Sequence, residues 1–303
     1  MKVFTIIVTY NGEKWIEKCL QAVQHQSEII VVDNHSSDAT VAIIQQQFPK
    51  VTLLQETTNH GFGKANNIGI KYALEHDADA VFLLNQDAYV QENTIQNLIE
   101  ASQNHPEYGI LSPVHLNGDG TEVDMNFLKF IQADTTNNLV SDLILQKKAT
   151  HPYSVRFVNA AAWLLPAKVC QQIGGFDPIF FLYGEDDNYC QRVLFHGFKI
   201  GICTQATVFH DSPNNNNKPQ EPLSEKALEQ FHNQVKVRFG NVNTNEIKKI
   251  NAFRRYLKRK AWWSLCKGQF QNYKVYQKRA QRINITAIQK SYATNSTKGN
   301  HYL

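Results

Sequence analysis

Polar residues and glycines that could bind a charged ligand are concentrated in five short segments of this 303-residue chain. Four of them are Thr9-Tyr10-Asn11-Gly12, Asp33-Asn34-His35-Ser36-Ser37-Asp38, the stretch 59–67, and Asn85-Gln86-Asp87. The fifth, Glu185-Asp186-Asp187-Asn188, brings together three carboxylates, which can accept protons or bind hard cations. Asn, Asp and Ser are also ordinary turn and helix-cap residues, which explains Asn11 and Ser37 equally well. That explanation accounts poorly for four such segments in succession.

The first four segments each follow a predicted strand. The pattern predicts strands at 3–9, 28–32, 51–55 and 79–84, alternating with helices at about 13–24, 37–48, 62–75 and 93–104. Continuous apolar strands that alternate with helices are typical of a parallel sheet covered on both faces. Ligands bind such sheets beyond the carboxyl ends of the strands, so we expect the polar segments to form one site.

The second half of the chain is less regular at first. We expect a strand at 155–165, a helix that runs from the acidic segment through Arg192, two closing strands at 200–203 and 206–210, and helices near 223–240, 246–268 and 272–290. The predicted domains are a catalytic domain (1–213), an Asn/Pro-rich loop (214–222) and a basic helical region (223–303). The loop is a candidate lid over a bound donor.

Composition excludes several classes of protein. With 42% hydrophobic and 19% charged residues, the chain is neither disordered nor fibrous, and no run of eighteen apolar residues predicts a membrane-spanning helix. Five scattered cysteines predict reduced thiols in a cytosolic protein. The sequence lacks the glycine motif of a Rossmann dehydrogenase after its first strand, a P-loop, and a Gly-x-Ser-x-Gly elbow.

Charge divides the chain into two parts. Residues 1–246 contain 17 Lys and Arg and 27 Asp and Glu, a balance of −10, whereas residues 247–303 contain 14 Lys and Arg and no acidic residue. Such a division indicates two regions with different partners. We expect the basic region to meet something anionic.

The motifs together resemble glycosyltransferase family 2, and within it the rhamnosyltransferase-like branch. The resemblance covers about residues 3–211 and rests on the five polar segments, in the family's order, together with Gly174-Gly175-Phe176-Asp177 and Arg192. It implies a GT-A fold, which is an α/β fold with a mostly parallel central sheet flanked by helices, followed here by a basic helical appendage. The implied reaction is the inverting transfer of a sugar from a nucleoside diphosphate, such as dTDP-rhamnose or a UDP-hexose, to a hydroxyl.

The resemblance also implies where the donor binds. Tyr10 would offer a stacking face to the nucleoside and Asp33 a carboxylate near the base or ribose; the alternatives are a turn aromatic for Tyr10 and a helix cap for Asp33. The residues expected to bind the donor are Thr9, Tyr10, Asn11, Asp33, Asn34, Gly61, Asn67, Asn85 and Asp87.

A departing diphosphate calls for a divalent cation, Mg²⁺ or Mn²⁺, held by oxygen ligands. The family usually presents Asp-x-Asp where this chain has Asn85-Gln86-Asp87, so Asp87 takes the more direct ligand position and Asn85 lacks one charge. His210 ends the last predicted strand and is a candidate metal ligand, with a purely structural role as the alternative.

In the family the Asp of the Glu-Asp motif deprotonates the acceptor, which makes Asp186 the candidate catalytic base. Its acidic neighbours would raise the pKa of Asp186, whereas a helix N-terminus would lower it. The expected acceptor-binding residues are Phe181, Tyr183, Glu185 and Arg192. Helix capping is the alternative role for the acidic segment.

The resemblance does not extend to the basic region, whose role is argued from charge. An amphipathic basic helix with Trp262 and Trp263 suits the surface of an anionic membrane, so we expect residues 247–290 to bind there. The protein would then be cytoplasmic and peripheral to the inner face of the membrane, beside a glycan or polyprenyl-linked acceptor of cell-surface polysaccharide or lipopolysaccharide synthesis. The alternatives are packing on the catalytic domain and, less favoured, nucleic-acid binding, for which no RNA-binding motif is present. The sequence does not determine the oligomeric state, and a homodimer is one option.

The competing class of function is a non-catalytic family member that binds nucleotide-sugar or glycan. Asn85 and Asn188, which stand where the family usually has Asp, favour it. The presence of both Asp87 and Asp186 favours an active enzyme.

Overall fold

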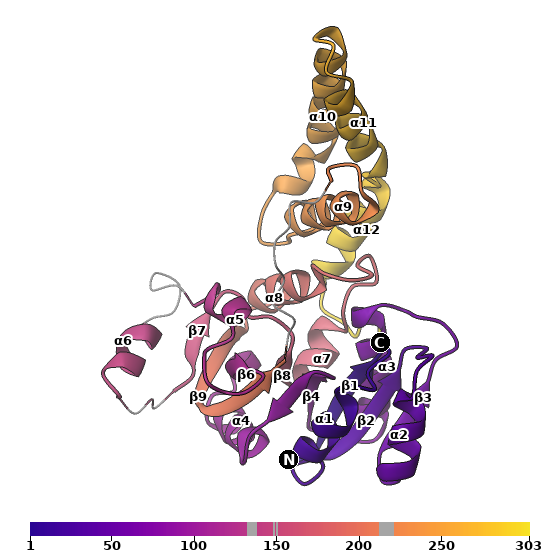
Figure 1. Cartoon of the computed structure of the whole chain (residues 1–303). Helices are drawn as coiled ribbons and strands as arrows, with labels where there is room; N and C mark the ends of the chain where they lie inside the picture. The colour runs from indigo at the N-terminus through magenta and orange to yellow at the C-terminus, as the bar shows by residue number, and fades with distance from the viewer. Residues whose placement is uncertain (132–137, 148, 150, 212–220) are drawn as a thin grey trace.

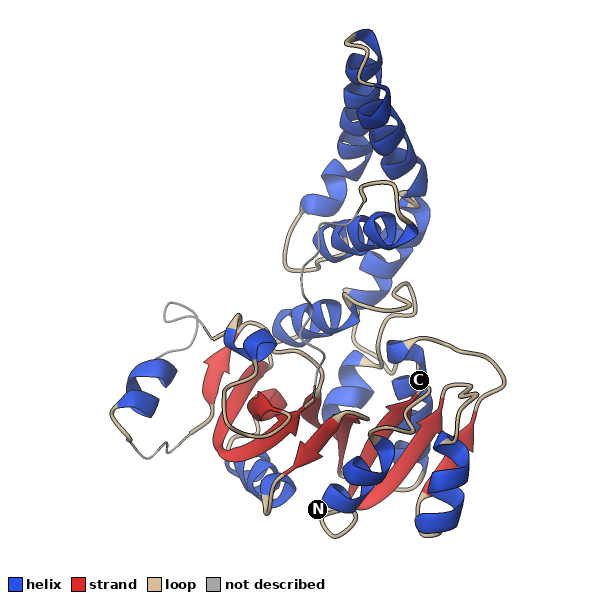
Figure 2. Cartoon of the chain, in the orientation of Figure 1, coloured by secondary structure: helices blue, strands red, loops and turns tan. Residues whose placement is uncertain are grey.

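A nine-stranded sheet forms the centre of the molecule (Figures 1 and 2). A computed structural model describes residues 1–131, 138–147, 149, 151–211 and 221–303, and the statements below concern these residues. The Asn/Pro-rich loop expected at 214–222 lies largely outside them. The strands are β1 (Val3–Thr9), β2 (Glu28–Asp33), β3 (Thr52–Gln55), β4 (Ala80–Asn85), β5 (Ala88–Val90), β6 (Tyr108–Asn117), β7 (Tyr153–Val155), β8 (Ala162–Pro166) and β9 (Lys199–His210).

The sheet is parallel in its N-terminal part and mixed beyond it. The strand order is β3-β2-β1-β4-β8-β6-β9-β5, with β7 paired to β9. Strands β3, β2, β1 and β4 run parallel, β8 runs antiparallel to β4, and β6 runs parallel to β9. The four parallel strands therefore end at one edge, where their polar exit segments meet.

Helices cover both faces of the sheet. The helices of this part are α1 (Ile16–Val23), α2 (Thr40–Gln47), α3 (Phe62–Glu75), α4 (Thr94–Asn104), α5 (Met125–Leu128), α6 (Leu139–Ile144), α7 (Ala167–Ile173) and α8 (Glu185–Phe195). One core cluster joins α3, α7 and α8 to the sheet, and a second joins α1, α2 and α4 to its other face. Burial on both faces explains why β1, β2 and β4 are nearly continuous apolar runs.

Two predicted strands differ from the structure. The strand expected at 155–165 is split into β7 and β8, because residues 156–161 leave the sheet between them. The two strands expected at 200–203 and 206–210 form one strand, β9, whose pairing with β6 shifts register between Pro113 and Val114. Strands β5 and β6 were not predicted.

The C-terminal helices form an arm that extends away from the sheet (Figure 1). They are α9 (Glu225–Phe239), the short 3-10 helix η1 (Glu246–Lys249), α10 (Ile250–Cys266), α11 (Phe270–Arg282) and α12 (Ile285–Asn295). The helix expected at 272–290 is broken, and Asn284 caps the start of α12 by accepting a hydrogen bond from the backbone N–H of Ala287 at 3.1 Å. None of the described helices is both long and apolar enough to cross a lipid bilayer.

Helices α10 and α11 form a hairpin that projects from the body, with α9 and α12 at its base (Figure 1). The segment from α12 onward packs back on the part of the chain that contains the sheet. Asp177 Oδ2 accepts hydrogen bonds from Ser291 Oγ at 2.5 Å and Asn295 Nδ2 at 2.8 Å. The backbone N–H of Gly175 donates to the carbonyl of His301 at 2.8 Å. Part of the basic region is therefore bound to the segment that leads into α8.

Candidate active site

The side chain of Gln86 joins the exits of β1 and β4. Its Oε1 accepts hydrogen bonds from Thr9 Oγ1 at 2.6 Å and from the backbone N–H of Tyr10 at 3.0 Å. The Thr9 hydroxyl is thus used inside the protein, while the Tyr10 side chain is 47% exposed. An exposed ring at this edge of the sheet can stack on a nucleobase.

Asp33 lies beside Tyr10, because Thr9 and Asp33 are paired between β1 and β2. The residue is buried, and its Oδ2 accepts a hydrogen bond from the backbone N–H of Ser36 at 3.1 Å. Its Oδ1 is also buried and has no hydrogen-bond partner among the described residues. Because an unpaired buried acceptor is costly, this oxygen is a candidate partner for a hydroxyl or N–H of a nucleoside.

Asn11 and Asn34, both expected to bind the donor, are used to hold the loops together. Asn11 Oδ1 accepts a hydrogen bond from the backbone N–H of Ser37 at 2.9 Å. Asn34 Nδ2 donates to Asn59 Oδ1 at 2.9 Å, and its Oδ1 accepts from the backbone N–H of His60 at 2.8 Å. These hydrogen bonds shape the edge of the site, and the donor-binding role expected for Asn11 and Asn34 stays a prediction.

Gly61 and Asn67 fix α3 to the segment before α8. Asn67 exchanges two hydrogen bonds with the backbone of Phe176, at 2.8 and 2.7 Å. Gly61 has φ +76°, and a Cβ there would overlap the carbonyl oxygen of Phe181. That oxygen also accepts a hydrogen bond from the backbone N–H of Phe62 at 3.1 Å. Both residues therefore hold the start of α3 against residues 176–181, and the donor-binding role that the sequence analysis gave them stays a prediction.

His210, at the end of β9, lies between two carboxylates. Its Nε2 is 3.5 Å from Asp87 Oδ1, and its Nδ1 is 3.2 Å from Asp124 Oδ2. Burial alone would lower the pKa of His210, but the hydrogen bonds and charges of Asp124 and Asp87 raise it to about 9. The backbone N–H of Asp211 donates to the carbonyl of Asp87 at 2.8 Å and keeps the end of β9 beside the turn after β4.

The chemistry of these side chains suits a divalent cation only in part. Asp87 and His210 are adjacent, and the nearby Asn85 Oδ1 is buried without a partner in the described part of the chain. Within that part, no three His, Cys, Asp or Glu side chains are arranged as a metal site. A carboxylate, an imidazole and an amide oxygen would fit a cation whose other ligands come from a diphosphate.

Asp186 lies in the first turn of α8, and two neighbouring alanines lie between it and the Asn85-Gln86-Asp87 turn. Its Oδ1 accepts a hydrogen bond from the backbone N–H of Asp187 at 2.8 Å, and the backbone N–H of Ala160 also acts to lower its pKa. The next carbonyl, that of Ala161, accepts a hydrogen bond from the backbone N–H of Asn85 at 2.9 Å. The candidate base and the Asn85-Gln86-Asp87 turn are therefore held by one short stretch of backbone.

Burial makes the acidic segment hard to ionise. It raises the pKa of Asp186, against which the backbone hydrogen bonds act in the opposite direction. Burial and the charge of Asp186 raise the pKa of Glu185 and of Asp187 to about 7. A carboxylate with a raised pKa is a better proton acceptor at neutral pH.

The loop before α8 carries two of the expected acceptor-binding residues, Phe181 and Tyr183. Phe181 and Tyr183 are exposed, whereas Phe180 is buried in the core. Tyr183 has φ 68°, an uncommon backbone conformation for a side chain of this size. From α9, Asn233 Nδ2 donates to the carbonyl of Leu182 at 2.7 Å and supports the loop from behind.

Arg192 does not face the acceptor side, contrary to the expectation. Its side chain is fully buried and donates to the carbonyls of Gly175, at 2.6 Å, and Ile173. Its guanidinium also lies over the rings of Tyr189 and Tyr302, 5.4 and 5.3 Å from their centroids. Arg192 therefore stabilises the turn after α7.

The sequence matches the family model described as Glycosyl transferase family 2 over residues 5–162, slightly more than half of the chain. The chain belongs to glycosyl transferase family 2. The matched region contains the four polar exit segments, and it ends where β8 begins.

Several characterised proteins are similar to this family 2 member. The low-salt glycan biosynthesis hexosyltransferase Agl10 of Haloferax volcanii is 27% identical over 209 residues, which are 69% of this chain and 66% of Agl10. The dTDP-rhamnosyl transferase RfbF of Shigella flexneri is 23% identical over 69% of this chain and 68% of RfbF. The N-acetylglucosaminyl-diphospho-decaprenol L-rhamnosyltransferase of Mycobacterium tuberculosis is 24% identical over 68% of this chain and 74% of that protein. The chain thus spans just under two thirds of Agl10.

Solved structures confirm the GT-A fold predicted for this family 2 chain. The structure of GalNAc-T7 with UDP, GalNAc and Mn²⁺ aligns with a TM-score of 0.58 at 15% identity, over 78% of this chain and 47% of that one. Residues 1–349 of TarS from S. aureus, in complex with UDP-GlcNAc, align with a TM-score of 0.54 at 17% identity, over 93% and 92%.

Two residues that the structure places among the candidate site residues, Gln86 and Asp124, were not predicted from the sequence. Gln86 lies between the two motif positions Asn85 and Asp87, so its position could have suggested a contact with the β1 exit. Asp124 is preceded by the unpredicted strand β6, and its one local signal is a helix cap: Oδ1 accepts from the backbone N–H of Phe127 at 2.9 Å. Its contact with His210 spans 86 residues and had no signal in the sequence.

Proposed function

We propose that this protein is an inverting glycosyltransferase that moves a sugar from a nucleoside diphosphate to a hydroxyl of a cell-surface glycan or lipid-linked acceptor. The observation that carries the proposal is that Asp186 and the Asn85-Gln86-Asp87 turn meet neighbouring residues of one backbone segment: the N–H of Ala160 acts to lower the pKa of Asp186, and the carbonyl of Ala161 accepts a hydrogen bond from the backbone N–H of Asn85 at 2.9 Å. It keeps a candidate base and a candidate diphosphate-binding turn in a fixed relation, as a displacement with inversion requires.

In the proposed reaction, the Asp186 carboxylate accepts the proton of the acceptor hydroxyl. The hydroxyl oxygen then bonds to the anomeric carbon of the donor sugar as the bond from that carbon to the diphosphate oxygen breaks. Asp33 and the Tyr10 ring bind and orient the nucleoside, and Phe181 and Tyr183 pack on the acceptor. Glu185 supports base function through its charge.

Asp87, His210 and Asn85 would hold a divalent cation, Mg²⁺ or Mn²⁺, together with the diphosphate. When bound, the cation neutralises charge on the leaving group. We expect Asn85→Asp to tighten Mn²⁺ binding in the presence of nucleoside diphosphate, measured by calorimetry, because a second carboxylate adds charge to the site.

The names of two relatives support particular classes of donor and acceptor. RfbF is named a dTDP-rhamnosyl transferase and the mycobacterial protein acts on a diphospho-decaprenol, so we infer a dTDP-rhamnose or UDP-hexose donor and a glycan or polyprenyl-linked acceptor. The charge of residues 247–303 supports a position at the inner, cytoplasmic face of a membrane that carries such acceptors.

The test is nucleoside diphosphate release from a panel of dTDP-, UDP- and GDP-sugars with Mg²⁺ or Mn²⁺ and mixed acceptor glycans. We expect turnover of one donor and a loss of about 10²- to 10⁴-fold in Asp186→Asn, the usual contribution of a general base. Asp77→Asn, at an exposed position outside every motif and before the start of β4, is the matched control and should keep full activity.

Two results would count against the proposal. Equal activity of Asp186→Asn and Asp77→Asn would exclude Asp186 as the base. If no donor is turned over while nucleotide still raises the melting temperature, the non-catalytic binding protein becomes the better hypothesis.

A further inference from the structure

The far end of the α10–α11 hairpin contributes little to the packed core. We call residues 256–276 the hairpin end. Within the hairpin end, the buried residues are Leu257, Ala261 and Ser264 of α10 and Val275 of α11; Ala280 of α11 is buried closer to the base. Every residue from 265 to 272 is exposed. The end therefore extends into solvent (Figure 1).

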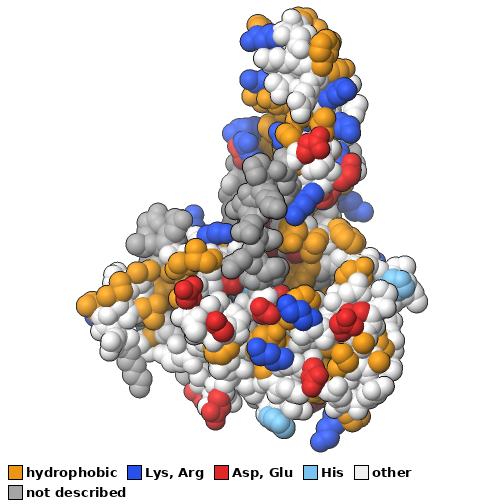
Figure 3. All heavy atoms as spheres, in the orientation of Figure 1, with side chains coloured by type: hydrophobic (Ala, Val, Ile, Leu, Met, Phe, Trp, Pro, Cys, Tyr) orange, Lys and Arg blue, Asp and Glu red, His pale blue; other side chains and the backbone are white. Residues whose placement is uncertain are grey.

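Large apolar side chains are nevertheless concentrated there. Trp262, Trp263 and Phe270 are 62%, 59% and 63% exposed, and Leu265 and Tyr256 are exposed as well. Figure 3 shows apolar and basic side chains side by side on the projecting hairpin. Packing within the described chain does not explain these exposed side chains, and apolar patches of this kind mark interaction surfaces.

The charges of the hairpin also differ between its base and its end. At the base, Arg282 forms ion pairs with Glu225 and Glu229 of α9, and Arg279 lies over the Phe231 ring. At the end, the cations are Lys258, Arg259, Lys260, Lys267 and Lys274, and none has a carboxylate within ion-pair distance in the described part of the chain. The positive charge of the end is therefore left for an external partner.

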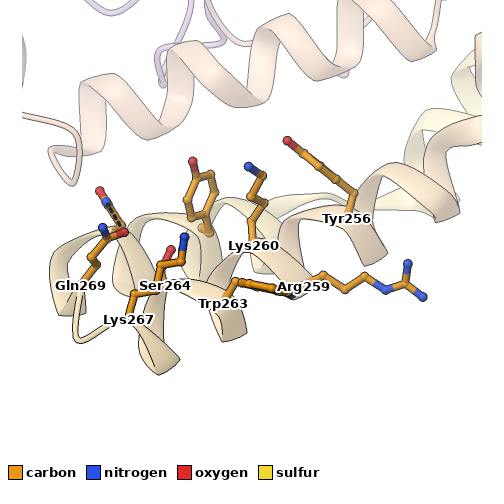
Figure 4. A pocket seen from close by; sticks show the side chains of 9 residues that line it. Tyr256, Arg259, Lys260, Trp263, Ser264, Lys267 and Gln269 are labelled. Carbon is orange, nitrogen blue, oxygen red and sulfur yellow. Dashed lines mark hydrogen bonds between the residues drawn. The ribbon is translucent and has the colours of Figure 1, made fainter.

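A pocket of about 370 Å³ lies among these side chains (Figure 4). It is lined by Tyr256, Arg259, Lys260, Trp263, Ser264, Lys267, Gln269, Asn272 and Tyr276. Lys260 Nζ lies 5.7 Å from the Tyr256 ring centroid, and Lys267 Nζ 5.7 Å from that of Trp263. The aromatic rings thus keep two ammonium groups at the pocket, where side-chain amides add hydrogen-bond donors.

We propose that the hairpin end is a docking surface for anionic phospholipids, with the phosphate of a headgroup in this pocket. Trp262, Trp263, Leu265 and Phe270 would enter the interfacial layer, where tryptophan is favoured, while the cations bind headgroup phosphates. This assignment rests on the proposed function, and it narrows the membrane-binding region expected at 247–290 to the hairpin end. The base of the hairpin and α12 pack on α9 and the catalytic part instead.

An anionic bilayer explains both features of the surface, whereas a nucleic acid explains mainly the charge. A nucleic-acid surface would use aromatic rings as stacking platforms in a basic groove. Here Leu265 and Phe270 accompany the tryptophans around the turn at Gly268 and give the end an apolar tip. Exposed apolar side chains next to cations suit the surface of an anionic bilayer, where headgroup phosphates lie beside the apolar chains.

The test is flotation of the full chain with vesicles of phosphatidylcholine alone or with 30% phosphatidylglycerol. We expect binding only to the anionic vesicles, and a loss of at least about tenfold in Arg259→Gln/Lys260→Gln/Lys267→Gln and in Trp262→Ala/Trp263→Ala. The matched control, Lys248→Gln/Lys290→Gln/Lys298→Gln, removes the same charge from exposed positions outside the hairpin end and should keep most of the binding.

Tryptophan fluorescence gives a second readout. Of the four tryptophans, only Trp262 and Trp263 belong to the hairpin end, so anionic vesicles should shift the emission of the wild type to the blue but not that of the double variant. Equal losses in the two triple variants would show a general charge effect and overturn the proposal. So would binding to single-stranded RNA without binding to vesicles. Donor turnover with a soluble acceptor should be unchanged in the hairpin variants, which separates this proposal from that of the transferase.

Discussion

Nδ1 of His210 lies 3.2 Å from Oδ2 of Asp124, a buried carboxylate at the start of α5. The same Asp124 has its pKa lowered to about 2, because the hydrogen bonds from His210 and from backbone N–H groups outweigh the effect of burial. A carboxylate in this position fixes which ring nitrogen of His210 faces Asp87. Asp124 is thus a positioning residue for the end of β9.

We expect Asp124→Asn to lower the pKa of His210 from about 9 by at least one unit, because one of its two charged partners is lost. The measurement is an NMR titration of the imidazole. Asp119→Asn, in the exposed turn that precedes Asp124, is the control and should leave the titration unchanged. An unaltered pKa in Asp124→Asn would mean that Asp87 alone raises it.

Stability should fall as the pH rises from about 4.5 to 7. Burial raises the pKa of Glu185 from 4.5, and of Asp187 from 3.8, to about 7, so the folded chain binds these protons more tightly than the unfolded chain. Their contribution is present below the unfolded pKa and is lost as the pH passes the folded one. Glu185→Gln, which resembles the protonated acid, should flatten this decline in urea unfolding curves. Glu92→Gln, at an exposed position, should not.

Gly61→Ala should destabilise the protein and reduce transfer to acceptor. The alanine would have to keep a positive φ, which is strained for a residue with a Cβ. Its Cβ would also overlap the Phe181 carbonyl, so the loop that carries Phe181 and Tyr183 must move. Gly197→Ala is a matched control, since Gly197 has φ +90° with open space around it. Gly197→Ala should therefore lower the melting temperature through strain alone. Equal effects of the two variants on transfer would contradict the positioning role of Gly61.

Asp177→Ala should loosen α12 from the catalytic part. It leaves Ser291 and Asn295 with unpaired buried groups, at a cost on the order of 3 kcal/mol. We expect faster hydrogen exchange in α12 and a lower midpoint of urea unfolding. Ser296→Ala removes a hydrogen bond that stays within the end of α12, to the Tyr292 carbonyl, and should leave that exchange nearly unchanged.

The sequence predicted the sheet edge well, because each exit segment follows a nearly continuous apolar strand. Helix α3 was predicted with its observed bounds, Phe62–Glu75, and α9 to within about two residues. Strand β6 was not predicted, because Pro113 and the polar residues after it interrupt the apolar pattern of a strand. The break before α12 did have a local signal in its cap residue, Asn284.

The sequence predicted where the polar segments lie in the fold better than it predicted what each side chain in them contacts. Polar side chains at a strand exit can bind a ligand or a neighbouring loop, and residue type alone does not distinguish the two. Arg192 illustrates this: a cation six residues beyond the candidate base suggested a ligand contact, whereas its helical position directs it to buried carbonyls of Ile173 and Gly175. Asp33 lies at this edge because β2 pairs with β1, and Asp87 lies there because it precedes β5, whose Ala88 pairs with His210.

The contacts of Gly175 and Asp177 with His301, Ser291 and Asn295 also bear on how the chain becomes active during synthesis. Asp177 and Ser291 are 114 residues apart, so the segment leading to Asp186 has no such support until most of the chain has left the ribosome. The parallel strands at the N-terminus can form far earlier, since their contacts are shorter in sequence. The proposed donor-binding edge would thus form before the loop that leads to Asp186, and in a chain interrupted within α11 that loop would lack the contacts of Asp177 with Ser291 and Asn295.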